Sequence, residues 1–193
     1  MPFIEKLAKN LPMTTETIPS LAGLEFIPYI DQNGQLPVQL QGKVGAYAIC
    51  DRHQVLQFIG YSRDVYLSLK QHLVRQPHLC YWVKVQTIDR PNRTILENIQ
   101  AAWIAENGTT PSGNSTDEAK WTQSINVKPL MTPEEQANYA QAAGEELAQS
   151  KILKNVARRV EAEIIAELKA RNVQTEIRFN PKLKDSGLLD LKY

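Results

Sequence analysis

The sequence predicts an α+β fold, in which a small antiparallel sheet is flanked by helices and followed by a helical C-terminal extension. Short apolar runs rich in β-branched and aromatic residues alternate with amphipathic segments of helix length up to residue 110. Two long amphipathic segments dominate the region after residue 132. With 193 residues, the chain has the length of one domain with a sizeable extension. We divide it into an N-terminal arm (1–23), an α+β domain (24–110), a loop (111–132) and a helical extension (133–193).

The predicted sheet begins with a strand over 24–30, and Pro28 confines that strand to an edge or a bulge because proline has no N–H to donate. Residues 44–50 and 55–60 form two further strands, joined by the polar turn at 51–53 into a hairpin. A third apolar run, over 79–86, adds another strand.

Two helices accompany these strands. We expect the first over 62–74, with Ser62 as its N-cap residue, and the second over 92–107. Pro91 opens the second helix and Gly108 follows it as the residue that ends it. Trp103 is expected in the core.

The C-terminal extension contains two predicted helices, over 133–149 and 151–171. Thr132, Pro133 and Glu135 form a typical helix start. The second helix carries an apolar stripe that fits either core packing, which we favour, or docking of a partner helix: Ile152, Val156, Val160, Ile164 and Leu168. A last strand is expected over 173–179, followed by a tail whose leucines dock onto the protein.

Composition excludes two broad classes of protein. Hydrophobic residues make up 42% of the chain and charged residues 22%, so a wholly disordered chain is excluded. No run approaches the length of a membrane-spanning helix, so we expect no integral membrane segment. The net charge of +1 argues against a generic, highly basic nucleic-acid binder. However, the charge is unevenly distributed along the chain. Residues 111–150 carry two basic and six acidic side chains, whereas residues 151–193 carry ten basic and six acidic ones. The local electrostatic field, rather than the net charge, therefore decides which ligands each region binds.

The two cysteines, Cys50 and Cys80, are far apart in the sequence and form no CxxC motif. We therefore expect two buried thiols rather than a disulfide or a zinc site. The N-terminus has no basic region followed by an apolar one, so it is unlike a secretory signal. Together these features predict a cytoplasmic protein in a reducing compartment.

Two short motifs fall on neighbouring predicted strands: Gly45-Ala46-Tyr47 and Phe58-Ile59-Gly60. A helix with His72 follows, and a second helix carries Glu97. This ordered set, within residues 41–110, resembles the GIY-YIG nuclease superfamily. The stretch Glu106-Asn107-Gly108…Pro111…Gly113-Asn114 and the helical C-terminal region also resemble uncharacterised GIY-YIG-like proteins of photosynthetic organisms.

The resemblance implies a phosphodiesterase site. Tyr47 takes the position of the tyrosine that assists in general-base chemistry, and Glu97 that of the glutamate that holds a divalent metal. Phe58 and Ser68 stand where the family has a tyrosine and an arginine, so two phosphate-contacting groups are missing. Arg63 is the candidate substitute for that arginine. His72 is a candidate catalytic residue, or else a residue placed at the negative end of its helix.

We therefore expect a catalytically degenerate GIY-YIG-like domain that acts as a binding or assembly factor for a protein complex, with a photosynthetic complex as one candidate. Its C-terminal helices and basic end would engage the protein partner. One alternative is a Mg²⁺-dependent endonuclease acting on DNA or RNA, and a second is a nucleic-acid-binding protein that does not cleave. No cofactor is expected, except Mg²⁺ for the nuclease. If these residues have structural roles only, we expect Tyr47 to be a half-buried strand residue and Glu97 to be a surface residue of a helix.

Overall fold

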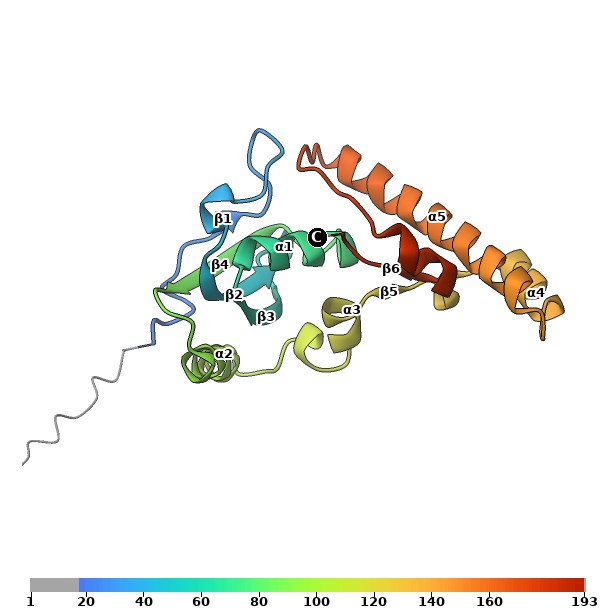
Figure 1. The fold of residues 1–193 in the computed structure, drawn as a ribbon. Helices are drawn as coiled ribbons and strands as arrows, with labels where there is room; N and C mark the ends of the chain where they lie inside the picture. Colours follow the sequence, from blue (N-terminus) through green and yellow to red (C-terminus); the bar gives the residue numbers. More distant parts are fainter. Residues whose placement is uncertain (1–17, 193) are drawn as a thin grey trace, which may run out of the picture.

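The computed structural model describes residues 18–192 and contains a four-stranded antiparallel sheet (Figure 1). The strands have the spatial order β1-β4-β2-β3. Their bounds are β1 Ile27–Pro28, β2 Val44–Cys50, β3 Leu56–Ser62 and β4 Trp82–Ile88. The chain therefore has the α+β architecture that the sequence predicts. Most of the predicted N-terminal arm lies outside the described residues.

β1 is an edge strand, as Pro28 predicted, but it is much shorter than expected. It pairs with β4 only at Ile27 and Pro28. The residues before it cannot extend the pairing, because Gly23 and Leu24 form turns in which their N–H groups donate to Ser20 and Leu21.

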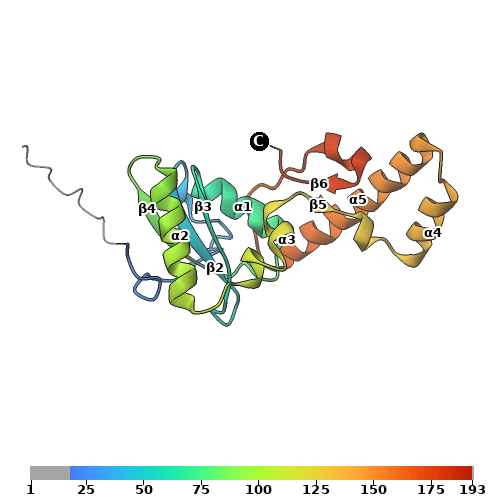
Figure 2. The same ribbon diagram turned by 90° about the horizontal axis from the view of Figure 1, so that it is seen from below.

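The two faces of the sheet have separate cores, since successive side chains of a strand point to opposite sides. Helix α1, Val65–Arg75, covers the face that carries Tyr47, Ile49 and Phe58. Helix α2, Arg93–Asn107, covers the other face with Leu96, Ile99 and the fully buried Trp103, confirming the predicted core position of that tryptophan. Figure 2 shows α2 and α1 on opposite sides of the strands, with the C-terminal part of the chain beyond α1.

The start of α1 differs from the prediction. Its N-cap residue is Asp64, whose carboxylate accepts the Leu67 N–H at 3.1 Å, whereas Ser62 ends β3. The Ser62 hydroxyl instead bonds within the turn, to the backbone of Asp64. α2 is capped by Asn92 and ends at Gly108, which has φ +78° as predicted for a left-handed terminating residue.

The segment predicted as a loop, 111–132, contains short elements. They are a 3₁₀ turn at Ser112–Asn114, helix α3 Glu118–Thr122, strand β5 Ile125–Asn126 and a 3₁₀ turn at Lys128–Leu130. The Asn114 side chain helps to hold this segment in place, because it accepts from the Ile59 N–H and donates to the Ile59 carbonyl, both at 2.7 Å. It thus satisfies both backbone groups of Ile59 on the open edge of β3.

The C-terminal extension contains helix α4, Pro133–Gln141, and the long helix α5, Glu146–Ala170. Thr132 and Glu135 form the predicted capping box. The first helix ends earlier than expected, because the chain turns at Gly144, which has φ +90°. The apolar stripe of α5 packs into the core rather than remaining free for a partner helix: Val156, Val160 and Leu168 are buried, and Ile152 and Ile164 pack against them.

The end of the chain docks as predicted, with Leu189 and Leu191 buried. The predicted strand over 173–179 is wrong, since only Phe179 forms an isolated bridge, to Leu191. Instead, a 3₁₀ helix at Pro181–Ser186 leads into strand β6, Leu188–Leu189, which pairs antiparallel with β5. Within residues 18–192, no helix combines the length and the apolar character needed to cross a membrane.

Candidate functional site

Tyr47 lies in the middle of β2 with 3% of its surface exposed. Its register partner in β3 is Gly60. A Cβ atom at position 60 would lie 2.6 Å from Phe58 Cε1 and 2.8 Å from the Tyr47 hydroxyl oxygen. The glycine of the second motif therefore makes room for the aromatic rings of both motifs.

The Tyr47 hydroxyl forms a hydrogen bond of 2.9 Å with His72 Nε2 of α1. Burial raises the pKa of Tyr47 well above its ordinary value, although the Ser68 hydroxyl and the Arg75 guanidinium oppose this effect. Burial, together with the nearby Arg75 charge, lowers the pKa of His72 to about 3. At neutral pH, the pair consists of a protonated phenol and a neutral imidazole.

Phe58 and Trp121 complete an aromatic group around this hydrogen bond, which we call the Tyr47 cluster (Tyr47, Phe58, His72 and Trp121). The Phe58 and Trp121 rings stack with centroids 5.2 Å apart and planes 4° apart. The Trp121 ring also lies 5.5 Å from His72. Trp121 is 1% exposed and comes from α3. A residue of the segment 111–132, which we call the connecting segment, therefore covers this face of the sheet.

A partly buried polar network holds α3 in this position. Arg75, in the last turn of α1, donates to the Trp121 carbonyl at 2.9 Å and to Asp190 Oδ2 at 3.0 Å. The Ser124 hydroxyl donates to the same Asp190 oxygen at 2.9 Å. We call Arg75, Ser124, Asp190 and the Trp121 carbonyl the Arg75 network.

Glu97 lies at a different place, on α2. Its carboxylate accepts from Arg93 Nε at 2.7 Å and from the Tyr61 hydroxyl at 3.2 Å. The bond from Arg93 is the main reason that the pKa of Glu97 is lowered. Arg63, Tyr61 and Arg93 line a cavity of about 370 Å³ beside it. We call these four residues the Tyr61 site.

The structure thus brings together some of the predicted site residues and separates others. Tyr47, Phe58 and His72 meet, and Ser68 lies near them on α1. Glu97 and Arg63 both lie at Tyr61, whose side chain packs on the α2 side of the sheet. Tyr47 packs on the α1 side. The phenol and the carboxylate expected to act together therefore belong to different faces.

The Tyr61 site fits a Mg²⁺ ion poorly. Magnesium ions are held in proteins by one or two carboxylates and keep several waters. The single candidate carboxylate, Glu97, is already bonded to the Arg93 guanidinium. Among residues 18–192, no three His, Cys, Asp or Glu side chains come together in a way that could hold a metal. A Mg²⁺ ion bound here would have to displace the Arg93 guanidinium from the Glu97 carboxylate.

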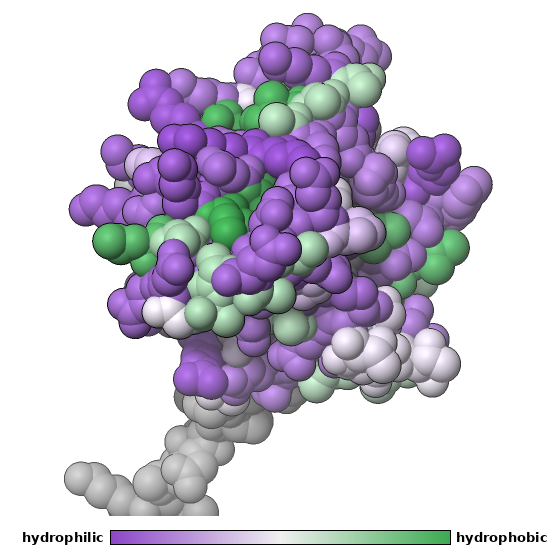
Figure 3. All heavy atoms as spheres, turned by 90° about the vertical axis from the view of Figure 1, so that its right-hand side faces the viewer, coloured by the Kyte–Doolittle hydropathy of each residue, from purple (hydrophilic) through white to green (hydrophobic). Residues whose placement is uncertain are grey.

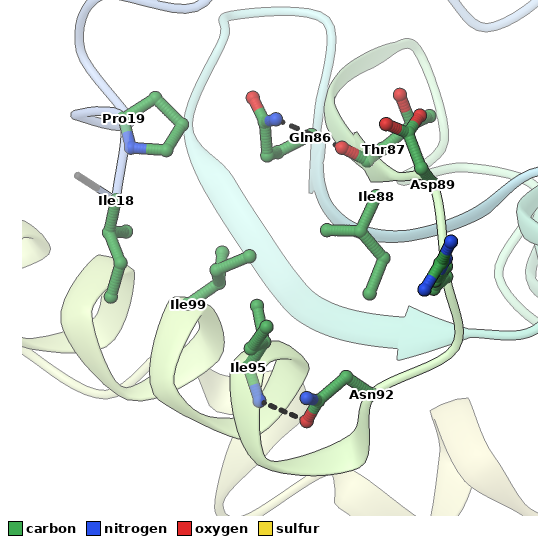
Figure 4. Close-up of a pocket in the computed structure, with 10 residues that line it drawn as sticks. Ile18, Pro19, Gln86, Thr87, Ile88, Asp89, Asn92, Ile95 and Ile99 are labelled. Carbon is green, nitrogen blue, oxygen red and sulfur yellow. Dashed lines mark hydrogen bonds between the residues drawn. The ribbon is translucent and has the colours of Figure 1, made fainter. Parts of the chain in front are cut away.

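A larger cavity, of about 680 Å³, lies between the end of β4 and the first turns of α2. Figure 4 shows Ile88 of β4 and Ile95 and Ile99 of α2 bordering it, with Ile18 on its far side. Its lining is about as polar as apolar, since Gln86, Asp89 and Arg90 also border it. The one hydrogen bond drawn on α2 runs from the Ile95 N–H to the side chain of the N-cap residue Asn92. The groove contains no nucleophile and general base in contact.

Neither the stacking of Trp121 on Phe58 nor the Arg75 network was predicted from the sequence. The pairing of Arg75 with Asp190 joins residues 115 positions apart, and no local pattern indicates such a contact. Pro111, Gly113 and Asn114 form a polar turn of the kind found in loops, and this pattern alone does not indicate that Asn114 bonds to Ile59, 55 positions away.

No protein-family model matches the chain. Among curated proteins, the chain is similar to bifunctional monothiol glutaredoxin-S16, chloroplastic, of Arabidopsis thaliana. The two are 31% identical over 103 residues, which are 51% of this chain and 33% of that protein. The similarity therefore covers about half of the chain and a third of its plant relative.

Proposed function

We propose that the chain is a catalytically inactive GIY-YIG-like domain that acts as a binding or assembly factor for other proteins. The observation that carries this proposal is the burial of Tyr47 inside the Tyr47 cluster. A general base must reach the proton that it removes. A phenol that is 3% exposed, hydrogen-bonded to His72 and raised in pKa is a poor base for a polynucleotide.

The side chains around Tyr47 support the same conclusion. Phe58 has no hydroxyl, and Ser68 has no positive charge to stabilise a phosphodiester. The loss of one transition-state donor typically lowers a rate by about 10²–10³-fold. Trp121 stacks on Phe58, so the connecting segment covers the ring that replaces the second tyrosine of the motif.

The buried cysteines of this chain support a function other than thiol chemistry, although its plant relative is named as a glutaredoxin. Its name describes a bifunctional glutaredoxin, and thiol–disulfide exchange requires an accessible thiolate. In this chain Cys50 and Cys80 are both buried and free, and burial raises their pKa values to about 11 and about 12. We infer that this chain's own cysteines do not perform glutaredoxin chemistry.

The partner would contact surface outside the α5 stripe, because that stripe is buried. Leu147, at the start of α5, is 90% exposed and Leu130 is 48% exposed. On the side of the molecule shown in Figure 3, hydrophobic residues form small patches between hydrophilic ones. The two free thiols fit a reducing compartment such as the cytoplasm. Because the relative's name places that protein in the chloroplast, a photosynthetic complex remains one candidate for assembly.

The first test is a cleavage assay with Mg²⁺ on single- and double-stranded DNA and RNA. We expect no cleavage by the wild-type protein, and none by the Glu97→Gln control. Mg²⁺-dependent cleavage that disappears in Tyr47→Phe would overturn the proposal. Purification under native conditions should also yield a stoichiometric protein complex, and recovery of the chain alone would count against a binding role.

A second candidate function, nucleic-acid binding without cleavage, is favoured by the Tyr61 site. Its cavity places the guanidinium groups of Arg63 and Arg93 beside an aromatic ring, which is a combination that suits phosphates and bases. Binding of labelled single-stranded RNA or DNA should weaken with salt. The double variant Arg63→Ala/Arg93→Ala should bind more weakly, whereas the exposed control Arg158→Ala on α5 should bind normally. Equal losses in both variants would contradict a site at Tyr61.

A further inference from the structure

Three segments that are far apart in the sequence meet at Arg75. The arginine belongs to α1, Trp121 and Ser124 belong to the connecting segment, and Asp190 belongs to the C-terminal tail. The side chain of Arg75 is 6% exposed and that of Asp190 is 18% exposed. Removal of one partner of this pair is unfavourable, because the other charge stays in a largely shielded place without its counter-charge.

The connecting segment and the tail are also joined to each other. β5 and β6 form a ladder of two residues each, and the Val127 N–H donates to the Gly187 carbonyl at 2.9 Å. An isolated two-stranded ladder is marginally stable in water. Residues 119–127 and 188–192, which we call the cover, therefore depend on contacts with α1, with the Tyr47 cluster and with α5.

We propose that the cover opens as one unit when the Arg75–Asp190 contact is lost, exposing the Tyr47–His72 pair to solvent. The geometry supports a common motion, because Asp190 is bonded both to Arg75 and to Ser124 of the connecting segment. Release of the tail therefore also releases the segment that carries Trp121. This inference goes beyond the proposed binding function, since it assigns a closed and an open state to the face that carries Tyr47.

Native-state amide hydrogen exchange of the full chain tests the proposal. In the wild-type protein, protected amides of the cover, such as those of Val127 and Lys192, should exchange through one shared opening that is more frequent than opening of β2 and β3. Asp190→Asn should accelerate exchange of the cover by about 10- to 100-fold, the effect expected for loss of a charged hydrogen bond. The His72 pKa, measured by NMR, should rise towards its ordinary value in this variant.

Asp185→Asn is the matched control, because it removes an ion pair with Lys154 in which the two side chains are 53% and 37% exposed. It should leave exchange of the cover unchanged. Ser124→Ala removes one hydrogen bond to Asp190 and should accelerate the same amides more weakly. The proposal is overturned if cover and sheet amides exchange together in the wild-type protein, or if Asp190→Asn leaves the cover and His72 unchanged. None of these measurements depends on cleavage or on a partner.

Discussion

The two faces of the sheet give a tyrosine two different environments. Tyr47 and Tyr61 lie on neighbouring strands, and each forms a hydrogen bond with one polar side chain. The bond of Tyr47 lies in a buried aromatic cluster, whereas the partner of Tyr61 is a carboxylate with 44% of its side chain exposed. Strand alternation alone decides which tyrosine meets which face. A motif tyrosine is therefore informative only together with the face on which it lies.

The ionic contacts of the two faces differ in the same way. Arg75 of α1 and Asp190 of the cover are largely shielded from water, with side chains 6% and 18% exposed, so each charge depends on the other. The Arg93–Glu97 pair is a surface pair of the i,i+4 type, and such pairs contribute little to stability. The α1 face thus has the properties of a structural core, and the α2 face retains exposed groups that can meet a ligand.

The strongest test of this contrast is Trp121→Ala. Because Trp121 is 1% exposed and stacks on Phe58, the variant should lose about 3–5 kcal/mol of unfolding free energy. Leu147→Ala, at a position that is 90% exposed, should change it by less than about 0.5 kcal/mol. Urea denaturation measures both. A small effect at Trp121 would mean that the α1 face is open in solution.

Local sequence patterns predicted the parts of the fold that depend on neighbouring residues. The β2–β3 hairpin, the capping box at Thr132, the left-handed Gly108 and the buried stripe of α5 follow from turn chemistry and periodicity. The Ser62 prediction was wrong because a second capping residue, Asp64, stands two positions later and reaches the correct amide.

The candidate site was less accessible to such reasoning. That Tyr61 points away from Phe58 could be derived from strand alternation, and the separate cores agree with it. The burial of Tyr47 beneath Trp121 could not be derived from the sequence, because it depends on contacts of Trp121 and Asp190 with α1 across long separations in sequence. A long polar segment gives no sign in its own pattern of the face on which it will pack.

The pH dependence of stability sharpens the contrast through His72. Its pKa is about 3 in the folded protein and about 6.5 when exposed. Between these values the unfolded chain binds a proton that the folded protein does not, so stability falls as the pH is lowered through this window. The slope from this one group reaches about 1.4 kcal/mol per pH unit. The unfolding free energy of the wild-type protein and of His72→Phe should be measured as a function of pH. The difference between the two curves isolates the contribution of His72, because the carboxylates titrate in both proteins. Parallel curves would show that His72 is accessible to water.

The smallest expected effect comes from removing one hydroxyl on each face. Tyr47→Phe leaves His72 Nε2 buried without its partner, so the unfolding free energy should fall by about 1–2 kcal/mol. Tyr61→Phe removes a bond to a carboxylate that water can replace, so its effect should stay below about 0.5 kcal/mol. The same denaturation series measures both variants, and each serves as the control for the other because the chemical change is identical. Equal losses would show that the two tyrosines are solvated alike, which would reopen Tyr47 as a residue that can meet a substrate.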